Sequence, residues 1–303
     1  MLEQYKAVTL PENVFRLIRD LISDYCGIYF DDDSRKTVER RLGRRLSVRG
    51  FDNFRDYYRF LLYDKDKESE LSEIIDIITV NETYFFREDK QFKAMIEEII
   101  PEMSVSMAER RKLRIWSAGC ASGEEPYSIA MLVLENRNLF SGLEIEIVAS
   151  DINRRVLEKA RQGTYTRNSF RSTDDYFKRR YFDREGEVYR IKSSVRELVS
   201  FSHVNLLDAY RQGIVGKVDI VFCRNVLIYF NNEAKKKVIE GFSDRLRDGG
   251  YLMLGHAESL MNISTGFTLK HLKNDMVYQK PRRSSFSMSD ESLYGMIWGG
   301  EGE

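Results

Sequence analysis

The segment 114–128, with the sequence RIWSAGCASGEEPYS, constrains the fold more than any other part of the chain. Its first half has the apolar pattern of a buried strand, its second half that of an amphipathic helix, and Gly119 and Gly123 lie in the turn between them. Such a turn commonly binds a nucleotide, but this one lacks the third glycine of the dinucleotide fingerprint. Glu124 and Glu125 also place negative charge where a pyrophosphate would lie. The segment therefore predicts a strand–turn–helix site for a ligand without phosphates.

Strands and helices alternate from about residue 112 onward. This alternation predicts an α/β fold with a mainly parallel sheet. Two short strand patterns at 267–272 and 276–281 predict an antiparallel pair at one edge of that sheet. The other predicted strands are 113–119, 143–151, 198–205, 218–225 and 251–257, and the predicted helices are 124–137, 154–162 and 233–250.

The remaining segments divide the chain further. Residues 10–80 contain helical patterns only, as in LPENVFRLIRDLISDYCGIYF, and predict a small all-helical domain. Residues 164–197 are too many for a normal loop and alternate around a Glu-Gly turn, which predicts an inserted antiparallel β-hairpin. The expected divisions are a helical domain at 1–80, an interdomain segment at 81–111, an α/β domain at 112–281 that contains the insertion, and a disordered tail at 282–303.

Four predicted strands carry a glycine or a polar residue at their carboxyl ends, namely Gly119, Asp151, Asn205 and Asn225. Each residue alone is a common cap or turn former. Because ligands bind beyond the carboxyl ends of strands in an open α/β sheet, together they predict one cleft. A carboxylate at the position of Asp151 can accept hydrogen bonds from both hydroxyls of a ribose, which indicates an adenosine-type ligand. The acidic turn favours S-adenosylmethionine, which carries a sulfonium and no phosphate, over a dinucleotide.

The segment 34–50, SRKTVERRLGRRLSVRG, is a strongly basic helical pattern with seven basic residues and one acidic residue. At about 100° per residue, its apolar residues share one face and its basic residues lie opposite. A run of charge is commonly a solvated helix face, and that interpretation stays open. The other interpretation is a docking surface for an acidic partner, formed by Arg40, Arg41, Arg44 and Arg45.

Composition argues against several other classes of protein. The 303 residues include 48 basic and 48 acidic side chains, so the global charge does not favour nucleic acid as a partner. No apolar run approaches the roughly 18 residues of a membrane span, and the first residues lack a signal-peptide pattern. The three cysteines and three histidines have no paired spacing that would predict disulfides or a metal site. We expect a cytoplasmic protein that binds no metal and no nucleic acid and does not insert into a membrane.

Five motifs follow one another along the chain: NETYFFRE at 81–88, SAGCASGEEPYSIAM at 117–131, ASDINRRVLEKARQGTY at 149–165, VNLLD at 204–208 and FCRNVLIYF at 222–230. Together they closely resemble the CheR-type methyltransferases of bacterial chemotaxis, and the resemblance spans about residues 10–280. It implies a class I, Rossmann-like methyltransferase fold preceded by a helical domain. It also implies methyl transfer from S-adenosylmethionine to glutamate side chains on the cytoplasmic helices of chemoreceptors. The products would be glutamyl methyl esters and S-adenosylhomocysteine, and we expect the enzyme to be a monomer.

The resemblance further implies roles for individual residues. The chemistry of the reaction indicates in addition that Arg87 can orient the incoming carboxylate through its guanidinium and that Tyr229 can hold it through its hydroxyl, with ordinary packing as the alternative for Tyr229. Asp151 should bind the ribose and Glu125 the amino end of the cofactor, although Glu124 stays an alternative for that contact. The expected cofactor-binding residues are Asn81, Thr83, Arg87, Gly119, Glu125, Asp151, Asn205, Leu206, Arg224 and Asn225. A glutamate has a reference pKa of about 4.3 and is ionised at neutral pH, so the reaction needs no general base.

Two alternatives stay open. One is a class I methyltransferase for a small molecule or a nucleic-acid base, although CRNVLIYF lacks the NPPY-like proline pair expected for base amino groups. The other is a binding module that keeps the cofactor and signals without catalysis. Within the expected family, the short and charged hairpin loop FDREGEV favours an enzyme that does not bind a receptor C-terminal pentapeptide.

Overall fold

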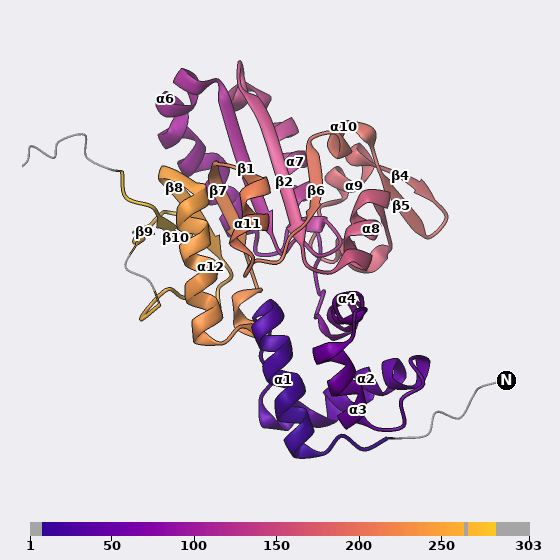
Figure 1. The fold of residues 1–303 in the computed structure, drawn as a ribbon. Helices are drawn as coiled ribbons and strands as arrows, with labels where there is room; N and C mark the ends of the chain where they lie inside the picture. Colours follow the sequence, from indigo (N-terminus) through magenta and orange to yellow (C-terminus); the bar gives the residue numbers. More distant parts are fainter. Residues whose placement is uncertain (1–7, 264–265, 283–303) are drawn as a thin grey trace, which may run out of the picture.

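The first four α-helices form an all-helical part that lies below the sheet in Figure 1. The structure is a computed structural model, which describes residues 8–263 and 266–282. The helices are α1 (Glu12–Cys26), α2 (Arg35–Val48), α3 (Phe54–Tyr63) and α4 (Lys67–Ile78). Each helix contributes buried side chains to one apolar core, among them Ile18, Leu42, Tyr57 and Ile75. The predicted all-helical part is therefore confirmed.

A seven-stranded sheet forms the centre of the remaining chain. It is reached through α5 (Asp89–Ala94), a short π-helix (Met95–Ile99) and α6 (Ile100–Arg110). The strand order is β6-β2-β1-β7-β8-β10-β9; neighbouring strands from β6 to β8 are parallel, and β10 is antiparallel to both of its neighbours. The mainly parallel sheet with an antiparallel edge is therefore confirmed. Its strands are β1 (Lys112–Ala118), β2 (Glu144–Asp151), β6 (Val199–His203), β7 (Val218–Cys223), β8 (Leu246–Leu254), β9 (Thr268–His271) and β10 (Met276–Gln279).

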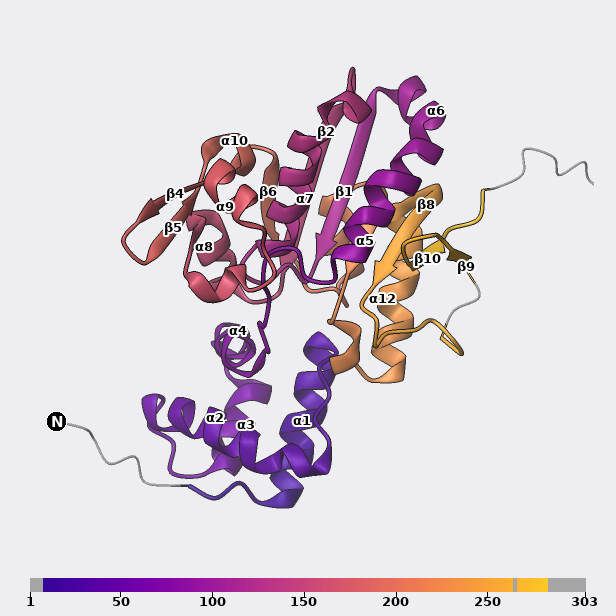
Figure 2. The ribbon, with the colours of Figure 1, turned by 180° about the vertical axis from the view of Figure 1, so that it is seen from behind.

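Helices cover both faces of the sheet. Successive residues of β1 point to opposite faces, as in any strand. Ile115 belongs to an apolar core that includes residues of α6, α7 (Glu124–Glu135) and α8 (Arg154–Gln162). Trp116 packs on the other face, and its ring centroid lies 5.2 Å from that of Phe242 in α12 (Asn232–Arg245). The parallel strands point toward the helical part, so their carboxyl ends face it (Figures 1 and 2).

One predicted helix ends earlier than expected. The pattern 233–250 predicts a helix to Gly250, whereas α12 ends at Arg245 and β8 begins at Leu246. Leu246 pairs with Val218 of β7, and the register then shifts before the next pair. A Cβ atom at Gly250 would lie 2.8 Å from the backbone oxygen of Asp219, so glycine allows the two strands to approach closely there. Strand pairing therefore overrides the helical pattern.

The predicted insertion forms a small antiparallel sheet at one side of the large sheet (Figure 1). It comprises β3 (Thr164–Tyr165), α9 (Asp175–Tyr181), β4 (Phe182–Glu185), β5 (Val188–Ile191) and α10 (Ser193–Arg196), with the strand order β3-β5-β4. Strands β4 and β5 form the predicted hairpin, and Gly186 in its turn has a φ of 61°. The ring centroid of Phe85 lies 4.7 Å from that of Tyr165 and 5.1 Å from that of Phe170. Aromatic packing thus holds the interdomain segment against the insertion.

Residues 283–303 lie outside the described part of the chain, so the disorder of the tail stays a prediction. Within residues 8–263 and 266–282, no helix has the length and apolar character needed to cross a membrane.

Candidate functional site

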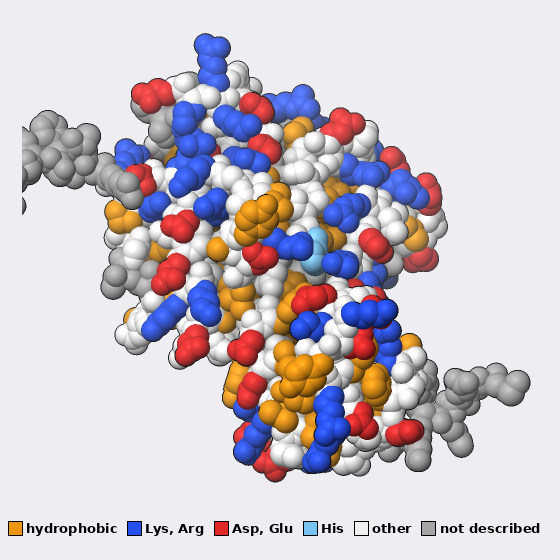
Figure 3. Space-filling model, in the orientation of Figure 1, with side chains coloured by type: hydrophobic (Ala, Val, Ile, Leu, Met, Phe, Trp, Pro, Cys, Tyr) orange, Lys and Arg blue, Asp and Glu red, His pale blue; other side chains and the backbone are white. Residues whose placement is uncertain are grey.

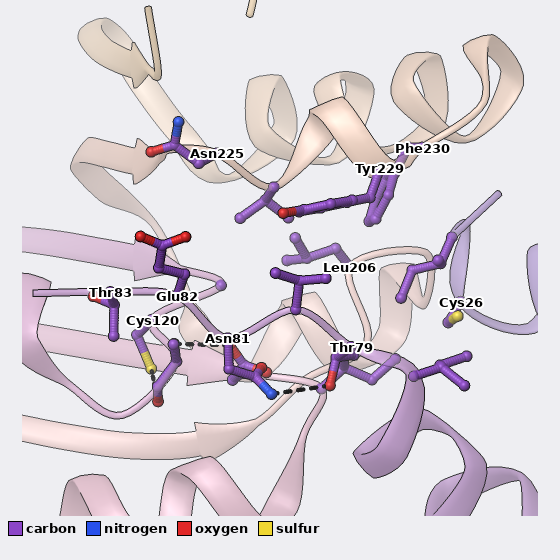
Figure 4. Close-up of a pocket in the computed structure, with 18 of the residues that line it drawn as sticks. Cys26, Thr79, Asn81, Glu82, Thr83, Cys120, Leu206, Asn225, Tyr229 and Phe230 are labelled. Atoms are coloured by element: carbon purple, nitrogen blue, oxygen red, sulfur yellow. Dashed lines mark hydrogen bonds between the residues drawn. The ribbon is translucent and has the colours of Figure 1, made fainter. Parts of the chain in front are cut away.

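A cleft with a volume of about 320 Å³ lies between the helical part and the carboxyl edge of the sheet. This volume is within the range of small-molecule sites. Figure 4 shows Asn225 and Tyr229 on one side of the cleft and Asn81 and Thr83 on the other. Every residue expected at the cofactor or at the methyl transfer lines it: Asn81, Thr83, Arg87, Gly119, Glu125, Asp151, Asn205, Leu206, Arg224, Asn225 and Tyr229.

The turn after β1 forms the floor of the cleft. Gly119 and Gly123 have φ values of 77° and 93°, which side chains other than glycine rarely adopt. A Cβ atom on Gly119 would lie 2.4 Å from Cγ2 of Val226, so a larger residue would displace the loop opposite. The backbone N–H groups of Gly119 and Cys120 donate to the carbonyl oxygen of Ser150, at 2.8 and 2.9 Å. These bonds fix the turn to the end of β2.

Asp151 is the last residue of β2, and its side chain is held by the backbone on both sides. Oδ2 accepts a hydrogen bond from the N–H of Ala121 at 2.9 Å, and Oδ1 accepts one from the N–H of Asn153 at 2.8 Å. Burial raises the pKa of the Asp151 carboxyl to about 6, although these hydrogen bonds lower it in part. Each carboxylate oxygen retains capacity for a further donor, as a pair of ribose hydroxyls would require.

The two glutamates after the turn point to different places. Glu125 lines the cleft, where it accepts a hydrogen bond from the hydroxyl of Ser117 at 2.7 Å. Glu124 is 2% exposed and accepts hydrogen bonds from the hydroxyls of Ser122 and Ser169, at 2.7 and 3.0 Å. Burial raises the pKa of both carboxyls. This geometry favours Glu125 over Glu124 for a contact with the cofactor.

Arg224 follows β7, lines the cleft and joins two acidic side chains. Its guanidinium lies 3.3 Å from the Glu125 carboxylate and 3.1 Å from that of Glu88, and it also donates to the backbone oxygen of Arg87. The Arg224 side chain is only 2% exposed. Buried charges of this kind are stable only when they are paired. Arg224 therefore fixes Glu125 in place, and Glu88 is a member of this network that the sequence analysis does not predict.

Asn225 is held in an unusual conformation by a glutamate that the sequence analysis also misses. Its φ is 59°, and its N–H donates to Glu258 at 2.8 Å. Glu258 comes shortly after β8, the neighbour of β7 in the sheet. The strand-end argument stops at the fourth predicted strand, and extending it to the polar residues after the fifth would have found Glu258.

The side-chain amides of two predicted cofactor residues already have partners within the protein. Asn205 donates from Nδ2 to the backbone oxygen of Tyr25 at 2.6 Å and accepts at Oδ1 from the N–H of Leu207 at 3.0 Å. Asn81 donates to the hydroxyl of Thr79 at 3.2 Å (Figure 4). The bond from Asn205 to Tyr25 joins the loop after β6 to α1 of the helical part.

Arg87 and Tyr229, the expected reactive-site residues, come from different segments. The Arg87 guanidinium donates to the backbone oxygen of Glu82 at 2.9 Å and lies over the ring of Tyr84. The backbone oxygen of Tyr229 accepts a hydrogen bond from the N–H of Tyr29 at 2.8 Å, beside a β-bridge between Ile28 and Phe230. The helical part thus packs directly on the loop that carries Tyr229.

The four predicted docking arginines of helix α2 point in different directions. Arg40 and Arg44 are exposed. Arg41 lines the cleft and donates to the backbone oxygen of Ile78 at 2.6 Å. Arg45 points inward instead and pairs with the fully buried carboxylate of Glu70, from Nε at 2.8 Å. The docking surface stays a prediction, and its solvent-facing cations are Arg40 and Arg44.

Comparison with known proteins shows two consecutive family matches. Residues 13–79 match the CheR methyltransferase all-alpha domain, and residues 81–275 match the CheR methyltransferase SAM-binding domain. The chain is 35% identical over 289 residues to chemotaxis protein methyltransferase 2 of Vibrio cholerae, covering 95% of this chain and 99% of that protein. It is 35% identical over 277 residues to the chemotaxis protein methyltransferase of Salmonella typhimurium, covering 89% of this chain and 92% of that protein.

A third relative is equally similar over a shorter length. The chemotaxis protein methyltransferase of Borreliella burgdorferi is 35% identical over 257 residues, covering 82% of this chain and 88% of that protein. The matches include both the helical part and the sheet, between which the cleft lies. The chain therefore belongs to the CheR methyltransferase family, and it is an S-adenosylmethionine-dependent methyltransferase of chemotaxis with a class I fold.

Proposed function

We propose that the chain methylates glutamate side chains on the cytoplasmic helices of chemoreceptors and forms glutamyl methyl esters. The charge of the cleft carries this proposal. The cations in its lining are the guanidinium groups of Arg41, Arg87 and Arg224, and no histidine or lysine lines it within the described residues. Arg224 is buried between Glu88 and Glu125, whereas Arg41 and Arg87 are partly exposed, so these two are the cations that an incoming group meets. Arg87 also lies 4.0 Å from Glu88, and the carboxylates of Glu82, Glu125 and Asp151 share the lining. A lining of this kind suits an anionic acceptor that needs no general base.

The acceptor that fits is a carboxylate. A glutamate is ionised at neutral pH and can attack without losing a proton first. The two thiols in the lining are poor competitors, because burial raises the pKa of Cys26 to about 12 and that of Cys120 well above its ordinary value. A covalent enzyme intermediate is therefore unnecessary for this reaction and is not favoured by the side chains present.

The same lining fits the cofactor. Oδ1 of Asn225 is buried and has no hydrogen-bond partner among the described residues. The ammonium group of S-adenosylmethionine would satisfy it, and Glu125 would add a negative charge nearby. Asp151 would accept the ribose hydroxyls, and the apolar side chain of Leu206 would pack against the adenine or the ribose. Asn81 and Thr83 would cover the cofactor from the interdomain segment.

When bound, S-adenosylmethionine supplies an electrophilic methyl group, and the S–CH₃ bond breaks as the carboxylate O–CH₃ bond forms. The task of this chain is alignment. Arg87 presents a planar fork of N–H donors that can orient one carboxylate oxygen toward the methyl group. Tyr229 can hold the acceptor through its hydroxyl. Ile28, Phe30 and Ile78 line the cleft and exclude water, which leaves the acceptor carboxylate less hydrated and more reactive.

Receptor recognition would rest on the helical part. Arg40 and Arg44 are exposed on α2, the same helix that places Arg41 in the cleft. An acidic helix docked on α2 would therefore bring its glutamates to the mouth of the cleft. Such a receptor places the reaction in the cytoplasm, and we propose that the enzyme acts as a monomer.

The test is transfer of labelled methyl groups from S-adenosylmethionine to a purified receptor cytoplasmic fragment, followed by peptide mapping. The proposal predicts label on glutamate side chains that mild base releases as methanol. A receptor fragment in which the mapped glutamates are replaced by alanine is the control and should lose the label. Base-stable label, or label on another residue type, would contradict the proposal.

The hairpin of the insertion permits a second test of recognition. Its turn contains only Gly186 and Glu187 between the paired residues Glu185 and Val188, and the residues of β4 after Phe182 are charged and exposed. We propose that receptors are found without a C-terminal tether at this hairpin. Titration with a labelled receptor C-terminal pentapeptide should show no micromolar binding, and such binding mapped to 178–192 would contradict this proposal.

A further inference from the structure

A single carboxylate organises the loop between β7 and α12. Oε2 of Glu258 accepts hydrogen bonds from the N–H groups of Asn225 at 2.8 Å and Gly255 at 2.7 Å. Oε1 accepts hydrogen bonds from the N–H groups of Val226 at 2.9 Å and Ile228 at 3.2 Å. Hydrogen bonds to an ionised acceptor are stronger than those between neutral groups. Glu258 therefore holds the carboxyl end of β8 and the loop after β7 together.

The hydrogen bonds of Glu258 stabilise the backbone conformation of Asn225, which is unfavourable by itself. Asn225 has a φ of 59°, in the left-handed region, which asparagine adopts more readily than other non-glycine residues but still at a cost. Such a conformation persists only when its surroundings determine it. Glu258 binds the N–H groups on both sides of the Asn225 α-carbon, that of Asn225 itself and that of Val226. The conformation of Asn225 is thus fixed by one side chain from a neighbouring strand end.

The side chain of Asn225 is placed for a ligand. A Cβ atom on Gly255 would lie 2.9 Å from Nδ2 of Asn225 and 2.9 Å from Oε2 of Glu258, so both groups pack against the bare glycine. Oδ1 of Asn225 is buried and has no hydrogen-bond partner among the described residues. A buried acceptor left in this state is costly unless a ligand pairs with it. Asn225 lines the cleft, where the methionine end of the cofactor is proposed to lie.

We propose that Glu258 is a positioning residue, which fixes the left-handed backbone of Asn225 and thereby aims the Asn225 amide oxygen at the cofactor. The proposal rests on the proposed contact between Asn225 and the cofactor. Glu258 itself is absent from the cleft lining and acts through Asn225. Glu258→Gln tests the idea with little change of size, because its amide group replaces one acceptor oxygen by a donor that faces backbone N–H groups.

The experiment is a double-mutant cycle on cofactor affinity, with S-adenosylhomocysteine as the probe in calorimetry on the full chain. Asn225→Ala and Glu258→Gln should each weaken binding by about tenfold. Because both variants remove the same contact, the double variant should also bind about tenfold more weakly than the wild type. Independent roles would instead multiply to about a hundredfold.

Glu98→Gln is a matched control. The Glu98 carboxylate also accepts loop N–H groups, those of Lys273 at 2.7 Å and Asn274 at 3.1 Å, but it does not line the cleft. The Glu98→Gln variant should lower the midpoint of unfolding about as much as Glu258→Gln does, and it should leave cofactor affinity unchanged. A loss of affinity in this control would show that loop stability alone explains the result, and the proposal would be wrong.

Each other outcome is equally decisive. Wild-type affinity in Glu258→Gln, or multiplied losses in the double variant, would overturn the positioning role. Wild-type affinity in Asn225→Ala would remove the contact on which the proposal rests, whereas glutamate methylation would still be judged by the transfer assay. If Glu258→Gln does not fold, Gly255→Ala disturbs the same junction from the opposite side and should also weaken binding.

Discussion

The two walls of the cleft differ in how firmly their side chains are held. On the sheet side, Asp151 and Arg224 are 8% and 7% exposed, and each makes several hydrogen bonds or ion pairs. On the helical side, Tyr29 and Val80 are 45% and 49% exposed. Arg41 on that side is held by a hydrogen bond to a backbone oxygen.

This difference matches two kinds of ligand. A cofactor that is the same in every turnover benefits from groups fixed before binding, because no ordering cost is then paid. A receptor helix is larger and presents different glutamates in turn, so a more open and more exposed wall can accept each of them. The sheet-side wall should therefore control cofactor affinity and stability, and the helical wall should control recognition of the protein substrate.

The largest effect should come from breaking the buried ion network of the sheet-side wall. Arg224→Met leaves the Glu88 and Glu125 carboxylates without their shared partner in a poorly hydrated place. We expect the free energy of unfolding to fall by about 3–5 kcal/mol, measured by urea denaturation. Arg16→Met removes an exposed pair with Glu12 and should change it by less than about 1 kcal/mol. Equal effects in the two variants would show that the network is not important for stability.

A smaller loss should follow removal of the proposed ribose acceptor. Asp151→Ala should weaken S-adenosylhomocysteine binding by about 1–3 kcal/mol, because polar ligand groups would be left unpaired. Calorimetry measures this directly. Unchanged affinity would mean that Asp151 serves only the turn, through its hydrogen bonds to Ala121 and Asn153.

The same residue predicts a pH dependence. The pKa of Asp151 is raised to about 6 by burial in the protein without ligand. Ribose hydroxyls would donate to the ionised carboxylate and lower that pKa, so the bound form prefers Asp151 without its proton. Affinity should therefore be highest above pH 6 and fall as the pH drops through 6, by at most about tenfold per pH unit. Asp151→Asn should flatten this part of the profile, and an unchanged slope in that variant would contradict the assignment.

Sequence alone predicted the sheet-side wall well because strand ends obey a simple geometric rule. The carboxyl ends of neighbouring parallel strands meet at one edge, so Gly119, Asp151 and Asn225 are brought together whatever the details of packing. The family resemblance then supplied Arg224 and the interdomain residues. Glu258 was missed because the strand-end argument stopped at the fourth predicted strand, whereas Glu258 directly follows the fifth.

The helical wall was predicted less well because its side chains depend on tertiary partners. Helical periodicity groups Arg45 with Arg41 and cannot show that Glu70, 25 residues further along, accepts its guanidinium. The end of α12 shows the same limit, because strand pairing of Leu246 with Val218 overrides a continuing helical pattern. Local sequence therefore predicts elements and strand ends, and packing decides where long side chains point.

The smallest effect on the enzyme itself should come from the exposed cations of α2. Reversal of both, in Arg40→Glu/Arg44→Glu, should raise the KM for receptor several-fold by repelling an acidic helix, with little change in stability. Added salt should lower the rate of the wild type more than that of this variant. Steady-state kinetics at two ionic strengths measures both, and an unchanged KM would return α2 to the interpretation as a solvated face.

The most direct test of the division between the two walls is one steady-state experiment in which cofactor and receptor fragment are both varied. It should compare the wild type with Asp151→Ala and with Arg40→Glu/Arg44→Glu. We predict that Asp151→Ala raises the KM for S-adenosylmethionine and leaves that for receptor nearly unchanged, and that the double reversal does the opposite. If either variant raised both KM values to the same degree, the two walls would not have separate roles, and the account would be contradicted.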